Sequence, residues 1–210
     1  MASFGHVAVG LLTGRLHGGE TRPTDRAAPA PVGALFLFMA LSMLPDADVF
    51  LVALGTSDAG PLGHRGVSHS FSFALAGGLV CALVARRVGW PVLRTALAGG
   101  LALASHAVMD ALGAGGRGLM LLWPFSFTRF HSPWRIFPDA PRGLKLLSQA
   151  GLFELVAEVL IFSPLTLYAL WPQIRARRQQ RPALPLTEGR GAAAAAPSAP
   201  AQDPRLRSSG

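Results

Sequence analysis

The sequence predicts an all-α membrane protein: a polytopic helical bundle with about four transmembrane helices plus a short N-terminal helix. Three observations support this fold class. Half of the 210 residues are hydrophobic, and only 14% are charged. The mean hydropathy of +0.39 is high for a soluble domain. The apolar residues gather in stretches long enough to cross a hydrocarbon core of roughly 30 Å, and most Lys and Arg residues lie between or after these stretches.

The first apolar stretch, residues 4–16, predicts a short amphipathic or re-entrant helix. At about 1.5 Å per residue it is too short to cross the hydrocarbon core. The chain start has no basic segment, so we do not expect a cleavable secretory signal. Residues 17–32 are rich in glycine, proline and charge and predict a loop.

Four membrane spans are expected, near residues 33–55, 71–90, 92–112 and 149–171. Pro45 interrupts the first of them, and Arg86 and Arg87 follow the apolar part of the second. Small residues such as Gly78 and Gly99 in the second and third spans allow close contact between helices.

The remaining segments predict one membrane domain, one interfacial loop and one tail. We expect a membrane-embedded domain over residues 1–172 and a basic, then Ala/Pro-rich, disordered tail over residues 173–210. Residues 119–142 are rich in Trp, Phe, Pro and Arg, which is typical of a loop at headgroup level. There Arg129 and Arg135 are expected near lipid phosphates, and the loop can also cover a substrate cleft.

Composition also argues against two classes of function. The net charge of +8 is compatible with a nucleic-acid partner, but no pattern of interleaved aromatic and basic residues accompanies it. We therefore expect the bilayer, and not nucleic acid, as the partner. The single Cys81 lies inside an apolar run, where we expect it to fill space. A cysteine-based zinc motif is absent from the sequence.

The segment 63–70, Gly-His-Arg-Gly-Val-Ser-His-Ser, directly precedes an apolar run that starts at Phe71. Histidine is both the commonest metal ligand and the commonest general base near neutral pH. His64 and His69 are therefore candidates for either role. The alternative is a polar helix cap, for which Ser68 and Ser70 are suitable.

Two further His/Asp clusters lie at the ends of apolar segments. Asp46 and Asp48 follow Pro45, and carboxylates in such a stretch are unfavourable unless paired, metal-bound or hydrated. Because the proline disfavours a continuous helix, both can turn toward one cation; the alternative is a helix end with two solvated aspartates. His106 and Asp110 share a helix face and can bind one metal, or the aspartate can orient the histidine through a local hydrogen bond.

Together these clusters resemble a known family. The similar segments occur in this order: His6 with Gly10, residues 44–48 (Leu-Pro-Asp-Ala-Asp), residues 64–70, Ser105 and His106 with Asp110, and residues 122–125 (Leu-Trp-Pro-Phe). Over residues 1 to about 170 the chain resembles the YdjM-like family of inner-membrane metal-dependent hydrolases. It departs from the family at Val49, where many members carry histidine, and at Ser68 and Gly113, where threonine is common.

The resemblance implies a metal-dependent hydrolase of the inner membrane. The expected ligands of one or two divalent cations are His6, Asp46, His69, His106 and Asp110. Zinc is the first choice, with manganese or iron as alternatives, because imidazole and carboxylate suit all three. Asp48 or His64 would take a proton, and Arg65 would hold an anionic group such as phosphate.

A phosphoester, in particular one derived from a lipid, is the preferred substrate class. The alternative is a non-enzymatic polytopic protein whose His/Asp set is a structural or transport site for metal. A transporter more often shows internal repeats with paired broken helices, and this sequence shows no repeat.

The distribution of Lys and Arg predicts the topology. With the four spans above, the positive-inside rule places both termini and the Arg86–Arg87 turn in the cytoplasm, and the loop with His64 and His69 on the outer side. His6 reaches that outer side only if residues 4–16 dip into the bilayer or if Pro45 ends a short first span.

Overall fold

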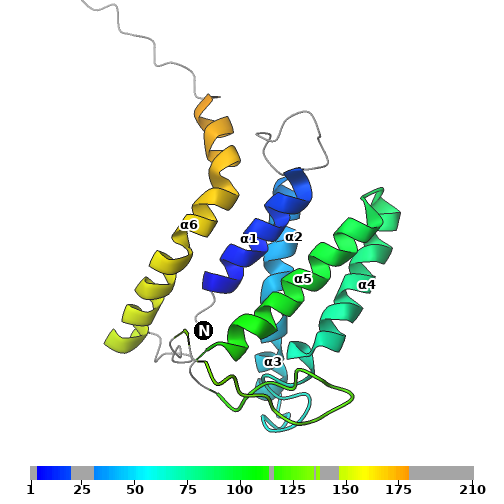
Figure 1. Cartoon of the computed structure of the whole chain (residues 1–210), viewed down its shortest axis with the longest axis vertical. Coiled ribbons are helices and arrows are strands. Elements are labelled where there is room, and N and C mark those ends of the chain that lie inside the picture. Colours follow the sequence, from blue (N-terminus) through cyan, green and yellow to red (C-terminus); the bar gives the residue numbers. More distant parts are fainter. Residues whose placement is uncertain (1–3, 20–30, 114–115, 135, 138–146, 180–210) are drawn as a thin grey trace, which may run out of the picture. The chain divides into compact units, whose positions relative to one another are not determined.

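The computed structural model describes residues 4–19, 31–113, 116–134, 136–137 and 147–179, and these residues are mainly helical (Figure 1). The longer helices are α1 (Phe4–Gly19), α2 (Val32–Met43), α4 (Phe71–Val88), α5 (Val92–Ala111) and α6 (Gln149–Gln179). The short ones are η1 (Leu44–Ala47), α3 (Asp48–Ala53) and η2 (Val67–His69). Within the described ranges the only β contacts are isolated bridges, so the predicted all-α fold is confirmed.

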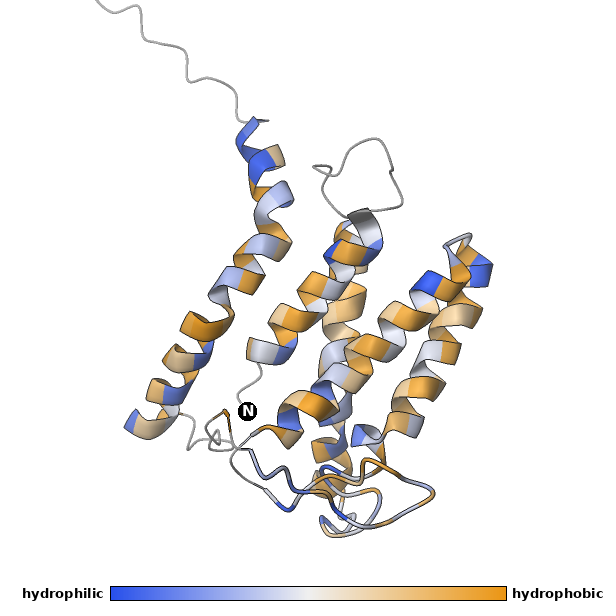
Figure 2. Ribbon diagram, viewed as in Figure 1, coloured by the Kyte–Doolittle hydropathy of each residue, from blue (hydrophilic) through white to orange (hydrophobic). Residues whose placement is uncertain are grey.

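Four of these helical segments are long and apolar enough to cross a membrane: Val32–Ala53, Phe71–Val88, Val92–Ala111 and Gln149–Gln179. Figure 2 shows apolar residues along the helices and polar residues concentrated near their ends. Large side chains such as Leu83, Leu101 and Phe153 are more than half exposed, as expected of surfaces that face lipid. α6 continues past the predicted domain boundary at residue 172, and residues 180–210 of the predicted tail lie outside the described part of the chain.

The first span is broken at the predicted proline. α2 ends at Met43, a 3-10 turn follows over Leu44–Ala47, and α3 begins at Asp48. Pro45 lies in the first turn of η1, where its missing N–H removes no helical hydrogen bond. The break places Asp46 in the 3-10 turn and Asp48 at the first residue of α3, both within the span.

α1 and α2 form a close antiparallel pair. A Cβ atom on Gly10 would lie 2.6 Å from Met39 Cα, and one on Gly14 would lie 2.7 Å from Leu35 Cα. Only glycine allows the two backbones to approach so closely. Because α2 runs toward η1, the antiparallel α1 begins beside η1, at the same end as the break at Pro45.

α4 and α5 form the second antiparallel pair. Ser70 caps α4 by accepting a hydrogen bond from Phe73 N, and Gly89 ends the helix with a φ of 72°. Gly78 faces Gly100, and Gly99 lies against the buried Cys81, which therefore fills space as predicted. This hairpin brings the start of α4 and the end of α5 together; α5 contacts both η1 and η2, and α4 contacts η2.

Candidate metal centre

Segments distant in sequence bring four predicted ligands together. Asp46 in η1, His69 in η2, and His106 and Asp110 near the end of α5 each offer one ligand atom, and these four atoms lie within 4.8 Å of one another. We call these four residues the His/Asp cluster. His69 and His106 are fully buried, Asp110 is 4% exposed, and the side chain of Asp46 is 29% exposed.

Two buried nitrogen atoms show that the cluster suits a cation. His69 Nε2 and His106 Nε2 are buried and have no hydrogen-bond partner. His106 Nε2 lies 3.3 Å from Asp46 Oδ1, and His69 Nε2 lies 3.6 Å from Asp110 Oδ2. Buried polar atoms are normally hydrogen-bonded, and unpaired imidazole nitrogens beside carboxylates are the donors that a divalent cation uses. The cluster can therefore hold a metal ion.

The opposite ring nitrogens fix the two histidines. His106 Nδ1 donates to the carbonyl oxygen of Ser42 at 2.7 Å, which leaves the lone pair on Nε2. Ser68 Oγ donates to Asp48 and lies 2.9 Å from His69 Nδ1, so it accepts the N–H of that ring. Metal-ligating histidines usually have such a partner on the second nitrogen, because it sets the tautomer and the ring orientation.

Asp48 lies on the Nδ1 side of the His69 ring. Its carboxylate is 4% exposed and accepts from three donors: His64 Nδ1 at 2.7 Å, Arg65 N at 3.1 Å and Ser68 Oγ at 2.6 Å. It also lies 3.3 Å from His69 Nδ1. Asp48 thus joins α3 to the His-Arg motif and to η2, and it is not one of the four residues of the His/Asp cluster.

Arg65 lies against the cluster. Its Nε donates to Asp110 Oδ2 at 3.1 Å, and the residue is 4% exposed. Arg65 has a φ of 64°, a left-handed conformation uncommon for a residue with a side chain. Gly116 lies so close to the guanidinium group that a Cβ atom there would overlap it. This predicted anion-binding residue is therefore adjacent to the candidate metal ligands.

His6 borders the cluster from α1. The residue is 1% exposed, its Nε2 lies 3.5 Å from Asp110 Oδ1, and its ring stacks on His106 at a centroid distance of 3.8 Å. His6 is thus in contact with the cluster without being one of its four residues. The close α1–α2 contact at Gly10 positions it there.

The electric field of the cluster favours positive charge. Burial by itself lowers the pKa of His69, but the neighbouring carboxylates, with Asp110 first, raise that pKa to about 10. A site that favours a protonated imidazole so strongly also favours a bound cation.

Arg129 has a role that the sequence did not reveal. Its guanidinium donates to six backbone carbonyl oxygens at 3.1–3.5 Å: those of Asp58, Ala59, Gly60, His64, Arg65 and Gly118. Arg129 therefore connects the loop before the His-Arg motif to residue 118, and its position near lipid phosphates stays a prediction. Burial lowers the pKa of Arg129, but an arginine remains charged. Arg135 lies outside the described residues.

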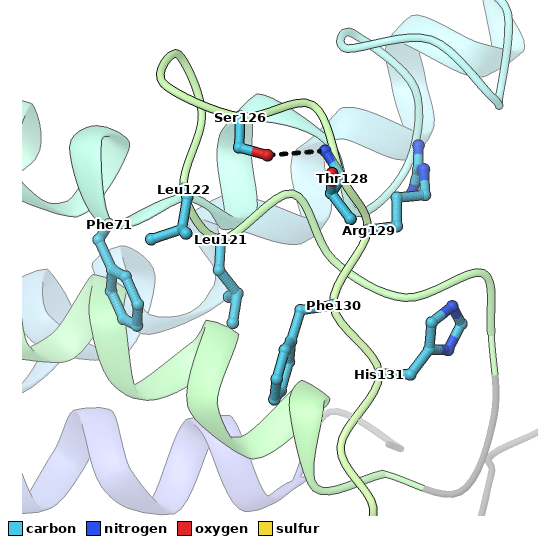
Figure 3. Close-up of a pocket in the computed structure, with 8 residues that line it drawn as sticks. All are labelled: Phe71, Leu121, Leu122, Ser126, Thr128, Arg129, Phe130 and His131. Carbon is cyan, nitrogen blue, oxygen red and sulfur yellow. Dashed lines mark hydrogen bonds between the residues drawn. The ribbon is translucent and has the colours of Figure 1, made fainter.

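A separate groove of about 460 Å³ lies beside the start of α4 (Figure 3). Its apolar lining comes from Phe71, Leu121, Leu122 and Phe130, and its polar lining includes Arg129 and His131. None of its lining residues belongs to the His/Asp cluster. The groove lies where residues 121–131 approach Phe71 at the start of α4, and its lining includes His131, which is not one of the four candidate metal ligands.

These features define a polytopic membrane protein with a buried His/Asp cluster at one end of its helical bundle. The family model described as YdjM inner membrane protein matches residues 1–178, and the chain belongs to this family. Together with the four apolar segments, this membership identifies a multi-pass protein of the inner membrane and confirms the predicted family and location.

The comparison with curated proteins gives a related inner membrane protein, YbcI of Escherichia coli strain K12. It is 38% identical over 117 residues, which cover 54% of this chain and 66% of that protein. The aligned region thus spans slightly less than two thirds of the relative. No solved structure matches the chain.

Proposed function

We propose that the protein is a membrane-bound metal-dependent hydrolase that acts on a phosphoester. The pair of buried, unpaired Nε2 atoms on His69 and His106, facing Asp46 and Asp110, is the observation that supports this most directly. These four residues would hold a divalent cation, with His6 as the neighbouring fifth donor. Zinc is the first choice, and manganese or iron suits the same donor set.

A divalent cation held there would polarise the scissile group and make water a better nucleophile near neutral pH. The chain supplies the other parts of the reaction. The geometry favours His64 over Asp48 as the proton acceptor, because Asp48 already accepts from three donors. The Asp48 carboxylate orients the His64 ring through Nδ1, which leaves Nε2 of that ring to take a proton from water.

Arg65 would hold an anionic group of the substrate. Its guanidinium is already anchored to Asp110 through Nε, and the planar fork of arginine suits two oxygens of a phosphate at once. This placement beside the cluster favours a phosphoester over a neutral ester or amide.

The alternative is a non-enzymatic metal site for structure or transport. Three of the four cluster residues are buried, and four protein donors would complete a tetrahedral site, which is typical of structural zinc. The exposed fraction of Asp46 favours the hydrolase, because a catalytic site must admit a substrate.

A comparison of the purified protein with its Arg65→Lys variant tests the proposal. Metal content is measured by elemental analysis, and hydrolysis is measured on a panel of phosphomonoesters and phosphodiesters. We expect about one cation per chain and activity on at least one phosphoester; Arg65→Lys should retain most of the metal and lose at least tenfold in kcat/KM. Bound metal without hydrolysis of any ester would favour the structural or transport role, and unchanged kcat/KM would assign Arg65 to holding Asp110.

A further inference from the structure

We infer that the substrate is an amphiphile: a phosphoester that carries an apolar chain and approaches the His/Asp cluster sideways, along the first span. This rests on the proposed function and adds the substrate class. The starting observation is that, of the four residues of the cluster, Asp46 alone is partly exposed. Asp46 is 29% exposed, while His69, His106 and Asp110 are between 0% and 4% exposed.

The loop end of the cluster is covered. Met120 N donates to the carbonyl oxygen of Arg65 at 3.1 Å, and Leu119 and Met120 are 2% and 5% exposed. Arg129 binds the carbonyl oxygens of His64 and Arg65 from the same side. In the described part of the chain, a ligand that came through this loop would have to break these contacts.

The surface beside Asp46 is apolar. Val49 and Phe50 follow Asp46 by three and four residues across the 3-10 turn and the first turn of α3, a spacing that keeps side chains near one another in both kinds of helix, and they are 43% and 69% exposed. Both belong to the candidate span Val32–Ala53. The exposed part of the cluster is therefore a carboxylate followed closely by exposed apolar side chains of a candidate membrane span.

The depth of Asp46 matches the boundary between headgroups and acyl chains. At about 1.5 Å per residue, Asp46 lies about 10 Å from the end of the span at Ala53. A partly exposed carboxylate at this depth is unfavourable unless a cation or a polar group covers it. An amphiphile can place its phosphate at the charged cluster and its apolar chain against Val49 and Phe50, so it matches both the charged and the apolar surface. A free phosphate matches only the charged surface.

A binding experiment separates these two sources of phosphate chemistry without requiring turnover. The protein is loaded with Mn²⁺ in dodecyl maltoside, which contains no phosphate, and the electron paramagnetic resonance spectrum of the metal is titrated with dodecylphosphonate or methylphosphonate. We expect dodecylphosphonate to change the spectrum at a concentration at least tenfold lower. Part of this difference in concentration arises because dodecylphosphonate partitions into the micelle. The comparison between the wild-type protein and its variants is therefore the decisive test.

Phe50→Gln should reduce the advantage of dodecylphosphonate about tenfold, because it removes apolar contact beside Asp46. Phe36→Gln is the matched control, since Phe36 is 62% exposed in the same span but distant along the helix, and it should leave the advantage unchanged. Val49→Asn is a second variant should Phe50→Gln fail to fold. The inference would be overturned if dodecylphosphonate had the same concentration advantage over methylphosphonate in every variant. It would also be overturned if neither phosphonate changed the spectrum.

The outcomes distinguish this inference from the proposed function. If dodecylphosphonate binds as expected but no phosphoester is hydrolysed, the hydrolase proposal fails and the amphiphile site stands. If phosphoesters are hydrolysed and Phe50→Gln leaves the ratio of kcat/KM for long-chain and short-chain esters unchanged, the hydrolase stands and the sideways approach fails. Absence of any Mn²⁺ binding would overturn both.

Discussion

Two buried histidines at opposite ends of the bundle differ in their neighbours. His17, in the last turn of α1, is 4% exposed; its Nε2 lies 2.8 Å from Thr95 Oγ1, which in turn donates to the carbonyl oxygen of Pro91. The neighbouring charged group is Arg94, and burial together with that cation lowers the pKa of His17. Nε2 of His17 thus pairs with a hydroxyl, while its Nδ1 is buried without a hydrogen-bond partner and no carboxylate contributes to its pKa in the described part of the chain.

His69 is buried as deeply, but carboxylates surround it and raise its pKa. Its Nε2 has no hydrogen-bond partner and faces Asp46 and Asp110. Burial alone therefore does not distinguish a structural histidine from a metal ligand; the charge of the neighbouring groups does. The predictions below test this contrast between the two ends, from the largest expected effect to the smallest.

The two ends should lie on opposite sides of the membrane, which is an all-or-none difference. Arg86, Arg87 and Arg94 lie at the His17 end, so the positive-inside rule places that end in the cytoplasm. Reporter fusions after Arg87 and after Arg178 should report the cytoplasm, and one after Gly60 should report the outer side.

A cytoplasmic signal from the Gly60 fusion would reverse the assignment and turn the cluster inward. The three fusions should be checked by cysteine labelling, because Cys81 is buried and contributes little background.

The spans and the break in the first one could be predicted because they depend on local features: long apolar runs, and Pro45 followed by aspartates. The meeting of Asp46, His69 and His106 could be expected only from the family resemblance, since it depends on which helix ends converge. The carbonyl contacts of Arg129 could not be predicted, because no spacing rule joins an arginine to a loop some sixty residues earlier. The orientation of α1 was open for the same reason: it follows from glycine contacts between helices, which charge distribution does not report.

Replacing a cluster histidine should remove most of the bound metal. His69→Ala or His106→Ala deletes a nitrogen donor and leaves buried carboxylates unpaired, so we expect metal affinity to fall by more than the roughly 10–100-fold typical of outer partners. His17→Ala is the matched control and should retain the metal. Elemental analysis of the purified variants gives the result; equal metal content in all three would eliminate the cluster as the metal site.

Asp48→Asn should have an intermediate effect. The amide keeps the shape of the side chain but loses the charge that orients His64 and His69. We expect metal affinity to fall about 10–100-fold with the fold preserved. Competition with a chelating dye measures the affinity, and circular dichroism checks the helix content. An unchanged affinity would show that Ser68 alone suffices to orient His69.

The smallest expected effect compares a hydroxyl at each end. Thr95→Val keeps the side-chain shape but removes the partner of His17 Nε2, which should destabilise the protein by about 1 kcal/mol and leave metal affinity unchanged. Ser68→Ala removes the hydroxyl between Asp48 and His69 and should produce a similar loss of stability together with a several-fold loss of metal affinity. Thermal unfolding in detergent and dye competition give both quantities for each variant. If Thr95→Val weakened metal binding as much as Ser68→Ala, the two ends would be coupled, and the distinction between a structural and a ligand histidine would no longer follow from their neighbours.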